Sequence, residues 1–363
     1  MIGILTFHAA HNYGSNLQAY ALQTKIALMG YENQIINYQP QQQKMMYAMI
    51  DTGKLSAASI LKSACNLLHY SKFSKRKKMF EAFICDRMNK SSEGYLSEDQ
   101  AVEAAQQYHT IVCGSDQIWN RNKGTRDKSW IFYLDFPHNC HSISYAPSMG
   151  NGLVFEDENK QLELISKFDC VSVREVQLSD YLIQKGISAQ AVVDPTLLLS
   201  QKEWDKVVGK CPVKKPYILF YSINCDRKAA TQVKRLAKQM RLPVVCPMWH
   251  PRLWGMGFQY CAAGPMEFLA LVKNADFVYT NSFHGTVFAT IFEKDFVSSM
   301  PRGQHDNRRE SFLNAVGLQD HIVFTDESLD SKNYRTQLNK EKMKECVESS
   351  ESFLYRSLER FEK

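Results

Sequence analysis

The sequence predicts an α/β protein made of two consecutive domains, and three observations support this class. Short apolar runs alternate with segments of helical periodicity along the chain, which is the pattern of parallel sheets covered by helices. The chain has 363 residues, 44% of them hydrophobic, which favours two cores over one. A lysine-rich connector at residues 200–215 separates the two series of elements. We place the domains at residues 1–205 and 206–340, with a C-terminal helix at 341–363 that packs across both.

The first series opens with an apolar strand at residues 1–7, followed by the polar loop HAAHNYGS, a helix that ends at Gly30 and the strand QIINY. Parallel α/β proteins bind ligands at the carboxyl ends of their strands, so this loop supplies candidate ligand contacts. It has no GxGxxG pattern, and nothing in it indicates a dinucleotide. A polar helical insertion is expected near residues 40–90. The candidate contacts of the loop are Asn12, Tyr13 and Gly14.

Two later strand ends of the first series carry charged residues. The strand HTIVCG runs into Ser115 and Asp116, which either contact a ligand or cap a following helix. The strand CVSVRE ends with Arg174 and Glu175. The guanidinium of Arg174 suits a carboxylate or phosphate, and a surface ion pair is the alternative. A strand and turn at SISYAPSMG lie between these two strands, and AVVDPTLLL closes the series.

The second series contains the stretch DFVYTNSFHGTVFATI, residues 276–291, which predicts a strand, a polar turn and a helix. His284 lies where the helix begins, beside unpaired backbone N–H groups that favour an anionic ligand. It is therefore a candidate proton donor, although a histidine that only caps the turn is the alternative. The loop after the next strand, KDFVSSM, holds three arginines: Arg302, Arg308 and Arg309. We expect these strand ends, with Arg174 and Asp116, to line a cleft between the domains.

Composition narrows the range of functions. The 44 Lys+Arg and 38 Asp+Glu give a net charge of +6, which suits small anionic substrates. The one dense basic run, at residues 75–78, predicts a solvated helix face and not a nucleic-acid groove. The ten cysteines form no CxxC pair and are expected to be reduced. No His/Cys cluster predicts a metal, and no apolar run approaches the roughly 20 residues of a membrane span. We expect a cytoplasmic protein without a metal or other cofactor.

Six ordered motifs resemble the polysaccharide pyruvyl transferase family. They are MIGILTFHAAHNYGSNLQAYALQ, GSDQIWN, ISYAPSMG, SVRE, VVDPTLLL and NSFHGTVFATIF, and together they extend from about residue 1 to about residue 317. The resemblance implies two Rossmann-like domains similar to the B-type glycosyltransferase fold. It also implies transfer of a pyruvyl group from phosphoenolpyruvate to a sugar hydroxyl pair, giving a ketal on an exopolysaccharide, a cell-envelope glycan or a lipid-linked precursor at the inner membrane face.

The resemblance also assigns roles to residues. The family's histidine before glycine matches His284, and its strand-end arginine matches Arg174, both at the phosphoenolpyruvate site. Asp116 is a third catalytic candidate, to orient the histidine or accept the sugar proton. Some relatives carry an arginine where this chain has Ser282, and the arginine loop is expected to supply the missing charge. The candidate substrate contacts are Asn12, Tyr13, Gly14, Ser115, Glu175, Asn281, Ser282, Phe283, Gly285, Arg302, Arg308 and Arg309.

Two other functions are compatible with the same pattern. One is a glycosyltransferase that uses a nucleotide sugar, and the other is a relative that binds glycan or a partner enzyme without catalysis. The serine at position 282 favours the second of these. The sugar acceptor and the oligomeric state are not readable from the sequence. Tyr13, Trp119, Trp249 and Trp254 are possible sugar-stacking residues, with core packing as the alternative.

Overall fold

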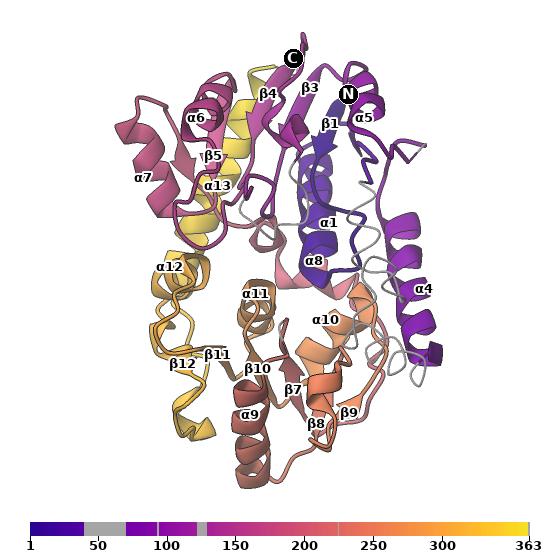
Figure 1. The fold of residues 1–363 in the computed structure, drawn as a ribbon, viewed down its shortest axis with the longest axis vertical. Helices are drawn as coiled ribbons and strands as arrows, with labels where there is room; N and C mark the ends of the chain where they lie inside the picture. Colours follow the sequence, from indigo (N-terminus) through magenta and orange to yellow (C-terminus); the bar gives the residue numbers. More distant parts are fainter. Residues whose placement is uncertain (40–69, 93, 122–128, 224, 362–363) are drawn as a thin grey trace. The chain divides into compact units, whose positions relative to one another are not determined.

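The computed structural model describes residues 1–39, 70–92, 94–121, 129–223 and 225–361 (Figure 1). The chain divides into two compact units. The first unit contains Met1–Ala48, Ile84–Leu199 and Lys344–Lys363, and the second contains Met49–Phe83 and Ser200–Met343. The chain passes from the first unit to the second at residue 200, at the start of the lysine-rich connector.

The first unit is built on a six-stranded sheet in which all neighbouring strands are parallel. The strand order is β2-β1-β3-β4-β5-β6, so the chain moves outward from β1 in both directions. The apolar runs that predicted strands are buried at this sheet, as in the four-residue strands β1 and β3. The strands are β1 (Ile2–Leu5), β2 (Asn33–Ile35), β3 (Thr110–Cys113), β4 (His141–Ser144), β5 (Cys170–Val173) and β6 (Gln190–Ala191).

Helices and short 3-10 turns cover this first sheet. Asn12 caps α1 by accepting hydrogen bonds from the N–H groups of Gly14 and Ser15, which explains why the helix starts directly after the HAAHNYGS loop. The elements are α1 (Tyr13–Leu28), α5 (Glu98–Ala105), η1 (Trp130–Tyr133), α6 (Glu158–Ser166), α7 (Val176–Gln184), η2 (Pro195–Leu197) and the C-terminal α13 (Lys340–Glu359).

The C-terminal helix α13 makes contacts inside the first unit. Lys25 of α1 forms an ion pair with Glu351, and the Ser350 hydroxyl accepts a hydrogen bond from the Val193 N–H. The ring of Phe361 stacks on His141 at a centroid distance of 4.0 Å. Residues 344–363 therefore belong to the first compact unit.

The second unit contains another six-stranded parallel sheet, in the order β12-β11-β10-β7-β8-β9. Here the chain moves outward from the neighbouring strands β7 and β10, which is the strand order of a Rossmann-type sheet. The strands are β7 (Ile218–Tyr221), β8 (Val244–Cys246), β9 (Gln259–Tyr260), β10 (Phe277–Thr280), β11 (Phe296–Met300) and β12 (Ile322–Phe324).

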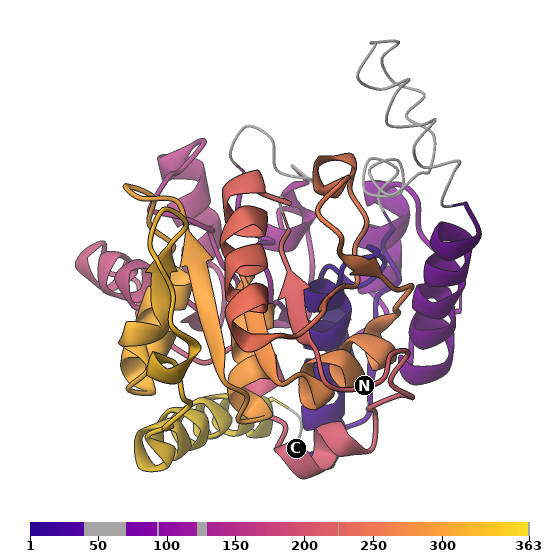
Figure 2. The ribbon, with the colours of Figure 1, turned by 90° about the horizontal axis from the view of Figure 1, so that it is seen from below.

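Its helices include α9, which contacts β7, β8 and η3, and α10 and α11, which contact each other (Figure 2). The predicted insertion near residues 40–90 is described only from residue 70 onward. That part is helix α4, and its residues 70–83 belong to the second unit. The elements are α4 (Tyr70–Arg87), α8 (Gln201–Asp205), α9 (Arg227–Met240), η3 (Pro251–Leu253), α10 (Pro265–Asn274), α11 (Phe283–Ile291), α12 (Asn307–Ala315), η4 (Gln319–His321) and η5 (Ser331–Asn333).

No helix among the described residues combines the length and apolar character that a membrane crossing needs. The prediction of two Rossmann-like α/β domains is confirmed by the two parallel sheets.

Candidate functional site

The loops after β1 and β3 meet at the switch point of the first sheet, where the strand order changes direction. Ser15 at the start of α1 donates a hydrogen bond to Asp116 Oδ2 over 2.7 Å. The Gln18 side chain accepts from the Ser115 N–H and donates to Thr6 Oγ1, at 3.1 and 2.9 Å. Open α/β sheets bind ligands at such a point. The two loops therefore form one hydrogen-bonded structure at the place where a ligand is expected.

Gly114 fixes the course of the chain into this structure. Its φ is +137°, a value that side chains of L-residues rarely allow, and a Cβ atom there would lie 1.9 Å from the carbonyl oxygen of Tyr145. The chain can pass so close to β4 only with glycine at this position. The described residues that follow, 117–121, do not form a helix, so the alternative in which Ser115 or Asp116 caps a helix that begins directly after it is wrong.

Asp116 has two identified hydrogen-bond donors and is only half-buried. Its Oδ1 accepts from the Gln117 N–H at 2.8 Å, and its Oδ2 accepts from Ser15. Its φ is +69°, and its backbone forms an isolated bridge with Pro147. The carboxylate is thus held in one orientation at the carboxyl edge of the sheet. Of the other predicted contacts in this region, Asn12 caps α1, while Tyr13 and Gly14 are buried in its first turn.

Arg174 lies directly after β5 and is buried, with 3% of its side chain exposed. Its Nη2 donates to the Ser115 hydroxyl over 2.7 Å and lies 3.0 Å from Asp194 Oδ2. Asp194 is fully buried, and its Oδ1 accepts from the N–H and hydroxyl of Thr196. Arg174 is therefore a buried ion-pair partner, not a surface one, and it connects the Ser115 turn to the chain after β6.

Glu175 is also buried at the end of β5. It accepts a hydrogen bond from the hydroxyl of Ser148, and the Ser148 hydroxyl in turn accepts from the N–H of Gly150. A side chain on Gly150 would clash with Asn120, since the Cβ would lie 2.5 Å from Nδ2. Glu175 thus supports the turn after β4, which is a structural role for a residue that was predicted to contact substrate.

His284 lies in the first turn of α11, directly after the switch point between β10 and β7 in the second unit. Ser282 is the N-cap residue, and its hydroxyl accepts from the Gly285 N–H at 3.3 Å. The Asn281 side chain accepts from the Ile223 N–H, which connects the turns after β10 and β7. His284 is 8% exposed, and its ring contacts that of Phe283 edge to face at 5.2 Å. The capping function belongs to Ser282, so His284 does not cap the turn.

Gly285 allows α11 to begin this close to the sheet. A Cβ at this position would lie 2.3 Å from Thr280 Oγ1 and 2.8 Å from Tyr221 Cδ1. Thr280 itself donates to the Tyr221 carbonyl at 2.8 Å and accepts from the Ser282 N–H. A larger residue would push the helix start, and the imidazole beside it, away from the strand ends. The His-Gly order of the sequence is thus a packing requirement of this corner.

The three arginines of the predicted loop have different surroundings. Arg302 is exposed and forms ion pairs with Asp326 and Glu327, at 3.0 Å each. Arg309 is buried and donates to the Ser298 hydroxyl and the Ser299 carbonyl. Arg309 therefore supports the end of β11, and Arg302 belongs to the surface.

Arg308 lies beside Phe283, the residue before His284. Its guanidinium carbon lies 5.9 Å from the ring centre of Phe283, and 12% of its side chain is exposed. Asp306 pairs with both Arg308 and Arg309. Burial opposes the charged form of Asp306, but the two arginines outweigh it and hold the pKa of this carboxyl below its ordinary value. The ion pair with Asp306 thus fixes the guanidinium of Arg308 next to the start of α11.

The candidate stacking residues divide into core and surface. Trp119 and Tyr13 are buried, at 0% and 1% exposure, and Trp119 stacks on Tyr133 at 5.4 Å. Trp249 contacts Phe73 edge to face at 6.3 Å, whereas Trp254 is 62% exposed. Core packing is therefore the role of Trp119 and Tyr13.

Within the described ranges, no group of three or more His, Cys, Asp or Glu residues is arranged to hold a metal ion. The nine cysteines that fall in these ranges are free thiols, and Cys65 lies outside the described residues. Burial raises the pKa of the Cys225 thiol to about 12, which keeps it protonated and unreactive at neutral pH.

Three residues that stabilise these strand ends were not predicted from the sequence as site residues. Gln18, Asp194 and Asp306 each connect segments through buried hydrogen bonds or ion pairs. Asp194 carried a visible signal, because Asp-Pro directly after an apolar run ends a strand, but the signal did not identify its partner. Gln18 lies on the buried face of a predicted helix, where a polar residue is a sign of a buried hydrogen-bond network.

Two parallel sheets with polar strand ends at both switch points define a two-domain, Rossmann-like protein with the B-type glycosyltransferase architecture. The fold is similar to that of the UDP-N-acetylglucosamine 2-epimerase from Rickettsia bellii, with a TM-score of 0.50, 10% identity, and coverage of 99% of this chain and 95% of that one. Another UDP-N-acetylglucosamine 2-epimerase gives a TM-score of 0.50 at 9% identity, covering 98% and 94%. The Escherichia coli heptosyltransferase WaaC gives 0.40 at 10% identity, covering 84% and 90%.

The family follows from the sequence. The family model described as polysaccharide pyruvyl transferase matches residues 12–299, which is most of the chain. The protein therefore belongs to the polysaccharide pyruvyl transferase family, a family of transferases, as its six motifs predicted. No protein with a curated function matches the chain at a significant level.

Proposed function

We propose that this protein transfers the pyruvyl group of phosphoenolpyruvate to two hydroxyls of a sugar and forms a pyruvate ketal. The product is a surface glycan, such as an exopolysaccharide, or its lipid-linked precursor, made on the cytoplasmic side of the membrane. Family membership supports the class of reaction. The observation that carries the donor assignment is the position of His284 in the first turn of α11, at the switch point of a parallel sheet.

The start of α11 suits an anionic donor. Phosphoenolpyruvate carries a carboxylate and a phosphate, and the first backbone N–H groups of a helix attract such anions. α11 has nine residues, and its cap Ser282 accepts from Gly285 N–H, while the Thr286 N–H donates to the Ser282 carbonyl. We propose that the N–H groups of Phe283 and His284 bind the donor phosphate.

The reaction needs one proton at carbon and one leaving group. His284, as imidazolium, donates a proton to the methylene carbon of phosphoenolpyruvate, and positive charge develops at the neighbouring carbon. A sugar hydroxyl attacks that carbon, and its proton passes to a base. The carbon–oxygen bond to phosphate then breaks, and phosphate leaves with the bond electrons. The second hydroxyl adds to the same carbon to close the ketal, and its proton passes to the released phosphate. General acid catalysis of this kind contributes roughly a hundred- to ten-thousand-fold in rate.

Asp116 is the better of the two candidate bases. Its carboxylate is half-buried, whereas Glu175 is 5% exposed and is held by Ser148. The hydrogen bonds from Ser15 and Gln117 fix the orientation of Asp116 without enclosing it. We propose that Asp116 receives the proton of the attacking hydroxyl.

We propose that Arg174 binds phosphoenolpyruvate while it keeps its ion pair with Asp194. Its guanidinium holds the Ser115 hydroxyl and Asp194, so it fixes the turn that carries Asp116. Its planar, positively charged guanidinium suits a carboxylate, and we propose that Arg174 contributes to binding of the donor carboxylate. Arg308 supplies the positive charge that Ser282 lacks, because it is the loop arginine that contacts Phe283.

The test is phosphate release from phosphoenolpyruvate in the presence of soluble saccharides and lipid-linked glycans. We expect release with phosphoenolpyruvate only when an acceptor is present, and formation of a ketal methyl group visible by NMR. Release of a nucleoside diphosphate from a nucleotide sugar, with no reaction of phosphoenolpyruvate, would identify the protein as a glycosyltransferase. Binding of glycan without any phosphate release would identify a non-catalytic relative.

A further inference from the structure

Charge is distributed unequally between the two units. The residues of the second unit include 28 Lys+Arg and 16 Asp+Glu, a net charge of +12, whereas the first unit has 16 and 22, a net charge of −6. The two values add to the +6 of the whole chain. An excess of this size on one unit produces a field that attracts anionic surfaces. The net charge of the whole chain does not reveal this excess, because the acidic residues of the first unit offset it.

Helix α9 is one source of this charge. Its sequence, RKAATQVKRLAKQM, contains five Lys or Arg and no Asp or Glu. Ala229, Val233 and Leu236 are buried in the core of the unit, so the cations occupy the opposite face. Its exposed basic residues are Arg227, Lys228, Arg235 and Lys238, and the C-cap Arg241 follows them.

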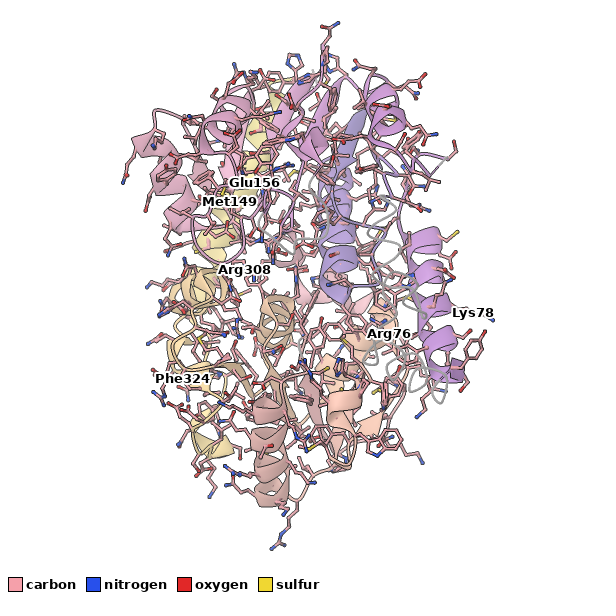
Figure 3. The ribbon with its side chains drawn as sticks, in the orientation of Figure 1. Arg76, Lys78, Met149, Glu156, Arg308 and Phe324 are labelled. Carbon is pink, nitrogen blue, oxygen red and sulfur yellow. The ribbon has the colours of Figure 1, made fainter. Side chains whose placement is uncertain are left out.

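The first half of α4 is the second source. Residues 70–80 contain five Lys or Arg and no acidic residue. Lys72 donates to the Tyr260 carbonyl of β9 at 3.1 Å, and the Phe73 ring contacts Tyr260, so this half of the helix lies along the edge strand of the sheet. Figure 3 shows Lys78 pointing outward from α4. The exposed cations here are Lys72, Lys75, Lys77 and Lys78.

The turn around η3 connects these two helices. Phe73 of α4 contacts Trp249, which comes just before η3. Helix α9 contacts η3 itself (Figure 2). Trp254, directly after η3, is 62% exposed. The two basic helices thus both contact the segment around η3, which carries the exposed indole. We call this set the β9-edge surface: Lys75, Lys77, Lys78, Arg235, Lys238 and Trp254.

We propose that the β9-edge surface docks on an anionic phospholipid bilayer. Clusters of Lys and Arg bind anionic headgroups, and tryptophan prefers the boundary between headgroups and acyl chains. A soluble polyanion would satisfy the cations but would give no reason for the exposed indole. Docking does not require the proposed reaction. The two are linked only because a lipid-linked acceptor would lie in the same bilayer.

The test is sedimentation of the full-length protein with vesicles, in the absence of donor and acceptor. We expect binding to vesicles of phosphatidylcholine mixed with phosphatidylglycerol, little binding to pure phosphatidylcholine, and weaker binding at high salt because ions screen the charges. Each Lys or Arg near an anionic membrane contributes about fivefold to binding. The charge reversals Lys75→Glu/Lys78→Glu and Arg235→Glu/Lys238→Glu should therefore each weaken binding by about 25-fold or more. Trp254→Ala should weaken binding while leaving its salt dependence intact.

The matched control is Lys332→Glu/Lys342→Glu. Both residues are exposed in the second unit, and Lys332 lies in η5, which follows β12 at the opposite edge of the sheet. This variant changes the charge of the unit equally and should bind vesicles almost as the unaltered protein does. Equal loss in the control would refute a localised surface. Binding to heparin without binding to anionic vesicles would show a polyanion site instead, and would also overturn the proposal. Because phosphoenolpyruvate is absent, the result does not depend on the proposed reaction.

Discussion

Removal of Asp194 tests whether the buried ion pair holds the first switch point together. The Asp194 side chain is fully buried and Arg174 is 3% exposed, with 3.0 Å between the charged atoms. Loss of one partner of such a pair leaves the other charge buried, which costs about 3–5 kcal/mol. Asp194→Ala also removes two hydrogen bonds from Thr196, at about 1 kcal/mol each. For a unit of this size we expect the melting temperature to fall by roughly 10 °C or more.

The assay is urea unfolding followed by circular dichroism, together with thermal melting. Asp194→Asn keeps the shape and one acceptor oxygen but removes the charge, so it should lie between Asp194→Ala and the unaltered protein. Lys185→Ala is the control, since its pair with Glu158 is exposed on both sides and should not affect the midpoint. If Asp194→Ala unfolds at the same urea concentration as this control, the pair does not stabilise the turn.

Three further predictions follow from the two switch points. Gly285→Ala should abolish phosphate release, because its Cβ would lie 2.3 Å from Thr280 Oγ1. Adding Thr280→Ala should restore part of the activity. Full activity of Gly285→Ala alone would show that the helix start is not constrained. Burial lowers the pKa of His8 below 6.5, so the unfolded chain binds more protons and stability should fall as pH drops below about 6.5. His8→Asn should reduce the dependence of stability on pH, measured by urea titrations at several pH values. An unchanged pH dependence would exclude His8 as its source. Arg308→Ala should raise the apparent KM for phosphoenolpyruvate about tenfold or more, whereas Arg302→Ala, a surface change, should leave it unaltered; equal effects would refute the choice of Arg308.

The sequence was sufficient for the positions of the four strands that carry candidate site residues at their ends. The apolar runs before Asn12, Ser115, Arg174 and Asn281 all became buried parallel strands, because burial on both faces requires continuous apolar sequence. The His-Gly pair was also located correctly at the junction of β10 and α11.

Partner choice was not predictable, since it depends on contacts between distant parts of the chain. Ser15 binds Asp116 across 101 positions of sequence, and Arg174 binds Ser115 across 59. No local pattern encodes such pairings. Strands of two residues, such as β9 (Gln259–Tyr260), carry too little sequence for a periodicity to be detected.

The exposure of individual charged residues was also not predictable from the sequence. Arg302 and Arg309 have the same side chain and lie seven positions apart, yet one is exposed and the other is buried against Ser298 and Ser299. The sequence places both in one loop, and only the packing of α12 on the end of β11 separates their roles.

The most direct test of the proposed chemistry is phosphate release in D₂O by His284→Gln and by the control His305→Gln. His305 is a histidine of the arginine loop whose side chain is 79% exposed. We predict that the unaltered protein and His305→Gln release phosphate and place one deuterium in the ketal methyl group, while His284→Gln is slower by a hundred- to ten-thousand-fold, roughly the range of general acid catalysis. Deuterated ketal formed by His284→Gln at the unaltered rate would contradict proton transfer from this histidine.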